Sequence, residues 1–288
     1  MVTIESAPVR TSRLRSVARR LTRSPLTLIG TVIVAIFLIT ALVGPLIAPF
    51  PYDQTLIDAR SQPPSLTHLF GTDNLGRDVF SRVVIGCRDI LSLAGLGTVI
   101  ALAIGTATGL VVAYQGGLFD EIVMRLLDAV LSLPAVLLAL LLLGALGPST
   151  QAVLAVIVVV YIPIVARVVR SVALETRTKS FVEAAKLRGE HYTYILAREI
   201  LPSVFPALVV EGSFRFAYAI FLVATLGFLG VGPQAPAPDW GLMVFQAREQ
   251  AAAAPWALFF PCAAIGVLVI GVNLMSDGLK EILQSGRE

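Results

Sequence analysis

The chain has 288 residues, of which 56% are hydrophobic and only 14% are charged, whereas soluble domains have about 45–50% apolar and about 25% charged residues. The charged residues are clustered, and several charge-free stretches between them exceed the roughly 20 apolar residues that a helix needs to cross a bilayer. With two cysteines and long apolar runs, the composition excludes a soluble enzyme, a disulfide scaffold and an outer-membrane barrel. It predicts an all-α polytopic membrane protein.

The net charge of +3 becomes informative once it is resolved along the chain. Six of the 22 Lys and Arg residues precede the first apolar run, and seven lie between Arg167 and Arg198. Basic residues favour the cytoplasmic side, so residues 1–25 and 170–201 are predicted to face the cytoplasm, as are both termini. The segment 49–89 has five Asp against four Arg and is predicted to lie outside. The basic tail is interpreted as a topology signal that contacts anionic lipid, not as a nucleic-acid site.

The first predicted span covers residues 26–48 and is opened by Pro25, which suits the first position of a helix. The external segment 49–89 begins with Pro- and Gly-rich loop chemistry. Within it, apolar residues recur on one helical face over 77–89, which predicts an amphipathic helix in the outer interface of the membrane.

Five further spans make six in total and belong to a core of residues 90–277, followed by a cytoplasmic tail, 278–288. They are predicted at residues 90–114, 120–146, 151–169, 202–229 and 256–275. In the second span, Gly105 and Gly109 form a pattern of small residues that lets another helix approach closely. Pro163 is predicted to kink the fourth span. No internal repeat is evident, which argues against a secondary transporter built from inverted repeats.

The sequence offers little for catalysis. The two histidines, His68 and His191, fall in predicted loops, and Cys87 and Cys262 are predicted to be unpaired. There is no H-E-x-x-H, no G-x-S-x-G and no close Cys/His spacing, so no catalytic residue, metal site or bound cofactor is predicted. The phosphate-binding G-x-x-x-x-G-K-[ST] pattern is also absent, so the chain is predicted to have no ATPase site of its own.

Ionisable residues inside the predicted spans are expensive in a bilayer and therefore informative. Glu211 and Arg215 are four positions apart in the fifth span and can pair on one helical face. Arg125 and Asp128 can pair in the same way near the inner end of the third span. Two interpretations of Glu211 and Arg215 stay open: a charged lining of a pore, or a pair that steadies helix packing.

The inward segment 170–201 has the most specific pattern. Ser180 and Glu183 have the spacing of a capping box, which predicts the start of a short helix. Ala184 and Ala185 give this helix a smooth face that can lie close to another protein, and Gly189 permits a turn. A second helical stretch is predicted to follow and to lead into the fifth span.

These residues resemble the EAA loop of ATP-binding-cassette importer permeases. The resemblance consists of Glu183, Ala184 and Ala185, then Gly189, and then Ile200 and Pro202. Family members often carry histidine just before the Ile-x-Pro, where this chain has Glu199. Further motifs are similar to the C-type permease subunit of dipeptide, oligopeptide and nickel importers, and the similarity covers nearly everything after Leu26. These motifs are His68 to Asp78, Gly227 to Gly232, Pro236 to Gly241, Ala254 to Trp256 and Asn273 to Gly278.

The resemblance implies the transmembrane domain of a type I importer, located in the bacterial cytoplasmic membrane. It implies that the EAA loop is a coupling helix that docks on one or two separate ATPase subunits, which hold ATP and Mg, and that a homologous B-type permease completes the pore. It also implies an extracytoplasmic solute-binding protein, for which Asp73, Arg77, Asp78 and Trp240 are candidate docking residues. Peptides are the expected cargo, with a nickel chelate or haem as alternatives. An ion-gradient-driven transporter is a further alternative.

Overall fold

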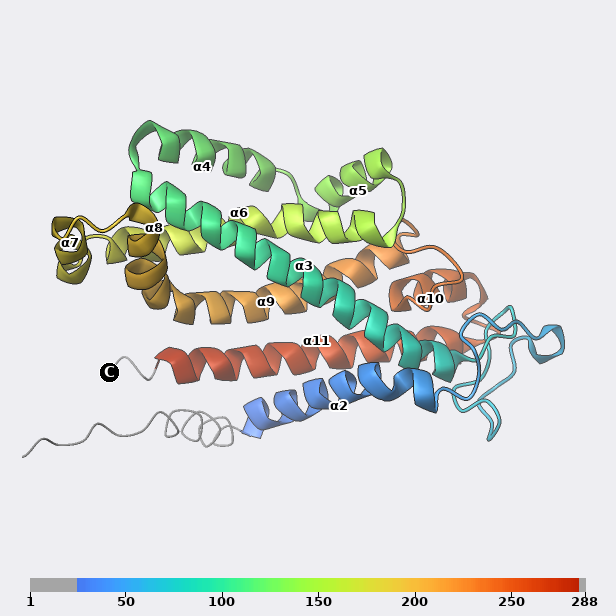
Figure 1. Ribbon diagram of the computed structural model, residues 1–288. Helices are drawn as coiled ribbons and strands as arrows, with labels where there is room; N and C mark the ends of the chain where they lie inside the picture. Colours follow the sequence, from blue (N-terminus) through green and yellow to red (C-terminus); the bar gives the residue numbers. More distant parts are fainter. Residues whose placement is uncertain (1–24, 285–288) are drawn as a thin grey trace, which may run out of the picture.

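A computed structural model of the chain describes residues 25–284, and the named elements of this part are all helices (Figure 1). The α-helices are α2 (Pro25–Ile47), α3 (Val79–Gln115), α4 (Gly117–Leu131), α5 (Ala135–Leu146), α6 (Thr150–Thr176), α7 (Ser180–Leu187), α8 (Tyr192–Tyr194), α9 (Leu201–Phe228), α10 (Trp240–Ala247) and α11 (Pro255–Gln284). Short 3-10 turns lie at η1 (Ile57–Ala59) and η3 (Arg248–Gln250), and η2 (Ile195–Ile200) is a π-helix. Residues 1–24 of the predicted basic tail, 1–25, lie outside the described part, and so do residues 285–288.

Within residues 25–284, five helices are long and apolar enough to cross a membrane: α2, α3, α6, the continuous run of α8, η2 and α9, and α11. A sixth crossing is counted when α4 and α5 are taken as one broken span. The long helices run roughly side by side, with α7 and α8 at one end and α10 and the long loop before α3 at the other (Figure 1). The predicted all-α polytopic fold is thus confirmed, with the third of its six crossings broken.

The centre of the bundle is the contact between α3 and α6, and it depends on glycine. A side chain at Gly105 would lie 2.7 Å from Val165, and one at Gly109 would lie 2.5 Å from the backbone oxygen of Ala166. Real Cβ atoms do not approach other atoms so closely, so only glycine fits at both positions. The predicted close approach at Gly105 and Gly109 is therefore confirmed.

The segment 77–89, predicted to form an amphipathic interfacial helix, is helical from Val79, but it is not a separate element. Residues 79–89 form the first turns of α3, which continues without a break to Gln115. Burial explains the difference, because Ser81 and Arg82, which belong to the polar side of the expected interfacial helix, are completely buried against other outer segments. The second crossing therefore begins about ten residues earlier than its apolar run suggests.

Three other boundaries differ from prediction, one of them at α11, which continues to Gln284, past the predicted end of the sixth crossing at 275 and into the predicted tail, 278–288. The third crossing breaks between α4 and α5, which meet at an angle of 89°. Pro134 explains the break, since proline cannot donate a backbone hydrogen bond and disfavours helical geometry in the residue before it. The fourth crossing contains Pro163 but continues to Thr176, past the predicted end at 169. Part of the inward segment 170–201 therefore belongs to this helix.

Candidate functional site

The inward segment forms a hairpin at the end of the bundle, built from α7 and α8 (Figure 1). Gly189 has φ +75°, a conformation that favours glycine, and it reverses the chain after α7. Its N–H donates to Lys186 O over 3.0 Å, and the N–H of Glu190 donates to Ala185 O over 3.2 Å. These two bonds form the glycine-terminated ending that is common for helices, and the predicted turn at Gly189 is confirmed.

The start of α7 is where the capping-box pattern placed it, but the predicted cap is wrong. Ser180 is the first helical residue, and Lys179 occupies the capping position without a side-chain hydrogen bond. The backbone oxygen of Lys179 accepts the N–H groups of Val182 and Glu183, over 3.0 and 3.2 Å. No side-chain hydrogen bond caps α7, and the side chains of Ser180 and Glu183 are both exposed.

The two alanines of α7 differ in burial. Ala185 is completely buried in a cluster that includes Val182 and Ile195, so its predicted role as an outward face is wrong. Ala184 is exposed, together with Phe181 and Leu187, whose side chains are 41% and 90% exposed. These three residues are spaced three apart and form one apolar stripe, here named the α7 stripe. Phe181 and Leu187 were not predicted from the sequence, although their spacing with Ala184 indicates a shared face.

The hairpin is joined to the crossing that follows through a widened helical turn. Over η2 the N–H of Leu201 reaches back to Leu196 O, one residue further than in an α-helix. Pro202 follows and has no N–H to give, which favours the irregular turn at this point. Ile200 is buried in the same cluster as Ala185, so this part of the motif holds the hairpin to the crossing.

Charged side chains hold the hairpin to the rest of this end. Arg188 lies 3.6 Å from Glu190 and 3.7 Å from Glu199, which links α7 to the widened turn. Arg177 donates to Ala113 O at the end of α3, over 2.6 Å. Glu199 therefore has a partner in Arg188, the residue that follows α7.

Glu211 and Arg215 form the predicted pair within α9. Arg215 Nε lies 2.7 Å from Glu211 Oε1, and both side chains are mostly buried. The guanidinium also lies over the rings of Tyr161 on α6 and Tyr218, at 5.7 and 5.0 Å from their centres. These contacts connect α9 to α6, which supports the packing interpretation of the pair.

The other predicted pair does not form. Arg125 pairs with Glu121 at 2.5 Å, and Asp128 pairs with Arg167 on the neighbouring helix α6. Arg167 was not identified as a partner, because it is separated from Asp128 by 39 positions along the chain.

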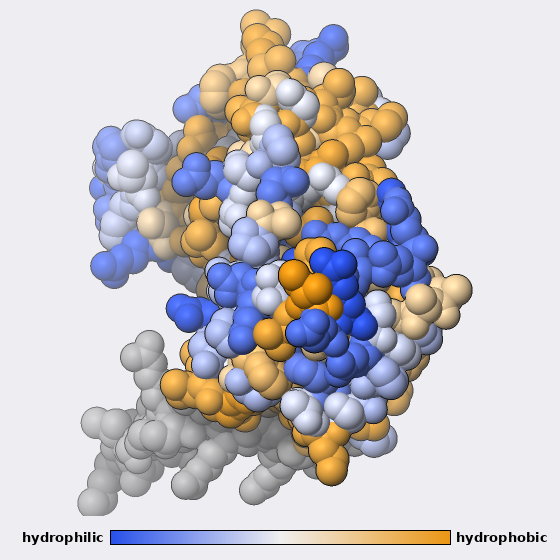
Figure 2. Space-filling view, turned by 90° about the vertical axis from the view of Figure 1, so that its right-hand side faces the viewer, coloured by the Kyte–Doolittle hydropathy of each residue, from blue (hydrophilic) through white to orange (hydrophobic). Residues whose placement is uncertain are grey.

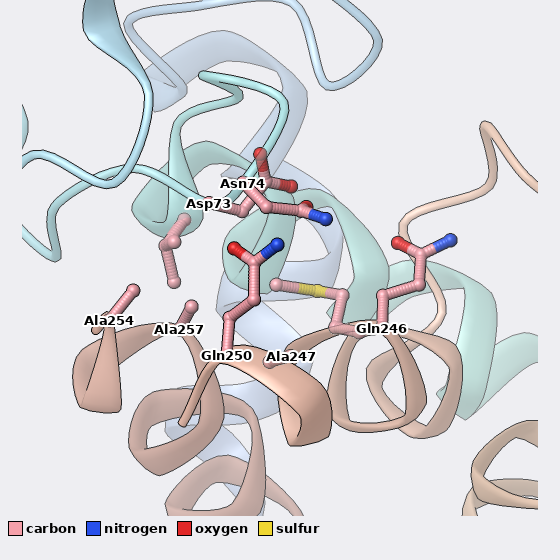
Figure 3. Close-up of a pocket in the computed structure, with 9 residues that line it drawn as sticks. Asp73, Asn74, Gln246, Ala247, Gln250, Ala254 and Ala257 are labelled. Atoms are coloured by element: carbon pink, nitrogen blue, oxygen red, sulfur yellow. The ribbon is translucent and has the colours of Figure 1, made fainter. Parts of the chain in front are cut away.

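At the opposite end, the candidate docking residues are occupied within the chain. Arg77 is 3% exposed; its Nε lies 2.6 Å from Asp73 Oδ2, and its Nη2 donates to Gln246 Oε1 over 2.7 Å. Figure 3 shows Asp73 and Asn74 across a hollow from Gln246 and Gln250. The hollow has about 10 Å³ of room, enough for one water molecule and too little for a peptide.

Asp78 and Trp240 are equally engaged. One carboxylate oxygen of Asp78 accepts the N–H of Ser81 at the start of α3 over 2.8 Å, and the other lies 2.9 Å from His68 Nδ1. The Trp240 side chain is completely buried, and its Nε1 donates to Val83 O over 2.9 Å. The docking prediction is wrong for Arg77, Asp78 and Trp240, because residues buried within the chain cannot offer a contact surface.

The residue that joins the outer segments was missed. Arg82 is fully buried and donates to Tyr52 O over 2.9 Å and to Ala237 O over 3.1 Å, so it ties the loop before α3 to the loop after α9. Figure 2 looks onto this end and shows hydrophilic side chains gathered at its centre, with hydrophobic ones around them. The exposed apolar side chains of the outer segments include Ile57 and Leu66.

A cavity of about 320 Å³ opens near this end between α3, α6 and the loop after α9. Its lining includes two carboxylates, Asp89 and Asp239. Burial raises the pKa of Asp239 to about 6, and the negative charge of Asp89 adds to this effect. The N–H of Leu242 and the charge of Arg82 oppose it. Asp239 is also the N-terminal cap of α10, since it accepts the Leu242 N–H over 2.8 Å.

Comparison with known families gives two matches. Residues 105–288 match the binding-protein-dependent transport system inner membrane component, and residues 12–64 match the N-terminal TM domain of oligopeptide transport permease C.

Similar proteins include the dipeptide transport system permease protein DppC of Alkalihalophilus pseudofirmus, which is 38% identical over 93% of this chain and 88% of its own length. The probable D,D-dipeptide transport system permease protein DdpC of Escherichia coli K12 is 39% identical over 90% of this chain and 87% of its own. The glutathione transport system permease protein GsiD of Escherichia coli O6:K15:H31 is 35% identical, over 92% and 88%. Among solved structures, the inward-facing MetNI methionine ABC transporter has a similar fold, with a TM-score of 0.57 and 19% identity over 71% of this chain and 95% of that chain.

Proposed function

Because the chain belongs to the family of binding-protein-dependent transport system inner membrane components, we propose that it forms half of the pore of an ATP-driven importer of di- or oligopeptides. It is a multi-pass inner-membrane protein of the permease type. Under this proposal a homologous permease forms the other half of the pore, and a solute-binding protein delivers the peptide from outside. Separate ATPase subunits would hold ATP and Mg.

The observation that carries the proposal is the α7 stripe. Leu187 is 90% exposed at the tip of the end that the basic residues place in the cytoplasm, where no lipid covers it. An apolar stripe in water is typical of a protein-binding surface, and a short helix with such a stripe suits a hydrophobic groove on a partner. We therefore assign the stripe to the ATPase subunit.

The contacts behind the stripe make α7 suitable for transmitting a movement. Val182 and Ala185 anchor its inner face in the cluster that contains Ile195 and Ile200 of η2, and Arg188, just after α7, lies 3.7 Å from Glu199 of η2. Since η2 continues directly into α9, a displacement of α7 would reach the membrane-crossing helix. To move a pore from 1:99 to 99:1 in favour of one state, the two nucleotide states must differ by about 5.5 kcal/mol, which requires a stiff connection.

The peptide cargo rests on relatives. The similar permeases are named for dipeptides, D,D-dipeptides and glutathione, and all three are peptides or peptide-like molecules. Uptake of a radiolabelled dipeptide into vesicles that contain the full complex tests the proposal. Uptake is expected when ATP is supplied on the side of the membrane that carries the ATPase subunits. No uptake is expected from a proton or sodium gradient alone. Uptake driven by a gradient without ATP would overturn it.

A further inference from the structure

The third crossing is broken inside the membrane. With 15 and 12 residues, α4 and α5 are about 22 and about 18 Å long at 1.5 Å per residue. Neither is long enough to cross the hydrocarbon core, which is about 30 Å thick. The chain enters α4 at the cytoplasmic end of α3 and leaves α5 for the opposite end of α6, so the two halves together make the crossing (Figure 1). The break at residues 132–134 therefore lies within the membrane.

The break leaves polar backbone groups without hydrogen bonds. The N–H groups of residues 135–137, at the start of α5, have no acceptor in the part of the chain that the structure describes, and no side chain caps this helix. The carbonyl groups of residues 131–133 likewise accept no hydrogen bond from a described residue. Residues 132–137 are all exposed. Bare polar backbone thus lies on the surface of this chain.

Lipid cannot cover such a break. Hydrocarbon offers no hydrogen-bonding partner, so irregular backbone at membrane depth occurs only where protein buries it or where it lines a water-filled cavity. The side chains around the break favour protein. Leu133, Val136 and Leu137 are exposed beside the free backbone groups, and α5 has no polar side chain. Water is readily lost from narrow apolar surroundings of this kind.

The outward side of α5 is suited to contact with another helix. Ala139 and Leu143 are buried in the main apolar cluster, where α5 packs on α6. On the other side of α5, Leu137, Leu141 and Gly144 are exposed and share one helical face, here named the α5 face. Nothing in the described chain lies within 4 Å of a side-chain carbon added at Gly144. A small residue on such a face lets a second membrane-crossing helix approach closely.

We propose that the second permease covers the break and the α5 face. One of its membrane-crossing helices supplies hydrogen bonds to the free backbone groups of residues 131–137. The partner that fits is an apolar helix with a hydroxyl or amide side chain at the level of the break. This inference rests on the proposed function, which supplies the second permease, and it adds where that permease binds.

The position of the break in the bundle agrees with this interface. Helices α4 and α5 form one edge of the molecule, and α2 lies at the opposite edge (Figure 1). Figure 2 keeps the same edge uppermost and shows mostly hydrophobic side chains there. A partner of similar apolar character can therefore pack along this edge without covering α2.

Two matched glycines test the α5 face. Gly144→Leu adds bulk to this face, whereas Gly266→Leu adds it to α11, where an added side-chain carbon also has nothing within 4 Å. We expect Gly144→Leu to reduce recovery of the second permease with the affinity-tagged chain several-fold, and Gly266→Leu to leave recovery unchanged. Unchanged recovery with Gly144→Leu, or equal loss with both variants, would overturn the assignment.

Photo-crosslinking in the complete purified complex keeps the test decisive if Gly144→Leu is not produced. Benzoylphenylalanine replaces Leu137 or, as the control, Leu38 on α2, and these side chains are 53% and 50% exposed. We expect light to join position 137 to the second permease, as identified by mass spectrometry, with several-fold less of this product from position 38. Crosslinks from position 137 only to lipid or to another copy of this chain, or equal yields from both positions, would overturn the proposal.

Thiol labelling distinguishes a protein contact from water. Ser132 at the break and Pro148 at the outer turn are both exposed in this chain. In the complete complex with Cys87 and Cys262 replaced by alanine, a membrane-impermeant maleimide is added to both sides of the membrane. We expect Pro148→Cys to be modified and Ser132→Cys to remain unmodified. Equal modification of the two variants would show a water-filled passage at the break and overturn the proposal.

ATP-dependent dipeptide uptake by the unaltered complex is measured in parallel. Uptake combined with a failed crosslinking or labelling result would overturn the interface alone. Absence of uptake by the unaltered complex would overturn the proposed function.

Discussion

The buried carboxylate of Asp239 makes the stability of the fold depend on pH. It lies against Gly227, where an added side-chain carbon would be only 2.2 Å from its Oδ1, and it is 3% exposed. Burial raises its pKa from 3.8 to about 6, so the folded state holds the proton more tightly than the unfolded chain. The contribution of Asp239 to the free energy of unfolding is fully present below about pH 4. It decreases as the pH rises from about 4 to about 6 and stays low above that.

Replacement of Asp239 by Asn is therefore expected to stabilise the protein at pH 7.5. Asn keeps an oxygen that can cap α10 and removes the buried charge, whose cost is at most about 3 kcal/mol for a shift of about two pKa units. The midpoint of thermal unfolding in detergent should be higher than that of the unaltered protein, and the difference should shrink at pH 5.

Asp239→Ala provides the control, since it removes the charge and the cap together, and the lost cap costs about 1 kcal/mol. It should be less stable than Asp239→Asn at every pH. An Asn variant that gains nothing at pH 7.5, or whose gain does not change with pH, would show that Asp239 is not held in a costly charged state.

At the level of the helix, the contact between α3 and α6 depends on the absence of side chains at three glycines of α3. Gly97, Gly105 and Gly109 each lie where a side-chain carbon would come within 2.7 Å of α6. Overpacking of this kind typically costs about 1–3 kcal/mol. The contact lies at the centre of the bundle, so we expect its loss to lower the free energy of unfolding of the whole molecule.

Gly109→Ala is expected to lower the free energy of unfolding by about 1–3 kcal/mol, which is measured as a lower unfolding midpoint in detergent. Gly266→Ala on α11 is the matched control, because nothing lies within 4 Å of the added carbon there, and it should unfold at or above the unaltered midpoint. Equal midpoints for the two variants would mean that α3 and α6 can separate without loss.

The hairpin after α7 depends on Gly189 in a different way. There is free space around its position, so only its backbone conformation, with φ +75°, restricts the residue. Asn adopts this conformation more readily than other residues, whereas a β-branched residue is strained there.

Gly189→Val is therefore expected to reduce ATP-dependent peptide uptake several-fold with normal amounts of the protein in the membrane, and Gly189→Asn to retain most of it. Gly189→Asp, which tolerates the same backbone but adds a charge beside the α7 stripe, separates conformation from electrostatics. Normal uptake and normal substrate-stimulated ATP hydrolysis in both the Val and the Asp variants would show that the turn does not take part in coupling.

The sequence predicts most of the helices and part of the site, for physical reasons that differ between features. The span at 26–48, the helix start at Ser180, the turn at Gly189 and the pair of Glu211 with Arg215 follow from local periodicity and spacing, and the structure has them. These features depend only on residues close together in the chain.

Other features depend on contacts between distant residues and were not predictable. Arg82 is buried because its partners are carbonyl groups of two loops, one of them 155 positions away, and this burial extends α3 outward. The break before α5 was missed because Pro134 lies inside an uncharged and mostly apolar run. Hydropathy alone predicts a single span for such a run. Asp128 pairs with Arg167 and not with Arg125 because α6 lies beside α4 in the fold.

At the scale of the whole molecule, we propose that a partner ATPase drives the pore through the α7 stripe. Phe181 and Leu187 are exposed, so their removal should change the stability of the chain by no more than about 0.5 kcal/mol. Their loss at the centre of a partner contact, in contrast, should weaken coupling by about tenfold or more.

The most direct measurement is the rate of dipeptide uptake, together with ATP hydrolysis stimulated by the loaded binding protein, in vesicles that contain the complete complex. The double variant Phe181→Ala and Leu187→Ala is compared with Leu66→Ala, which removes an exposed apolar side chain at the opposite end. We predict that both rates fall about tenfold or more in the double variant and are unchanged in the control. Normal uptake and normal stimulated hydrolysis in the double variant, with a normally assembled complex, would contradict the account.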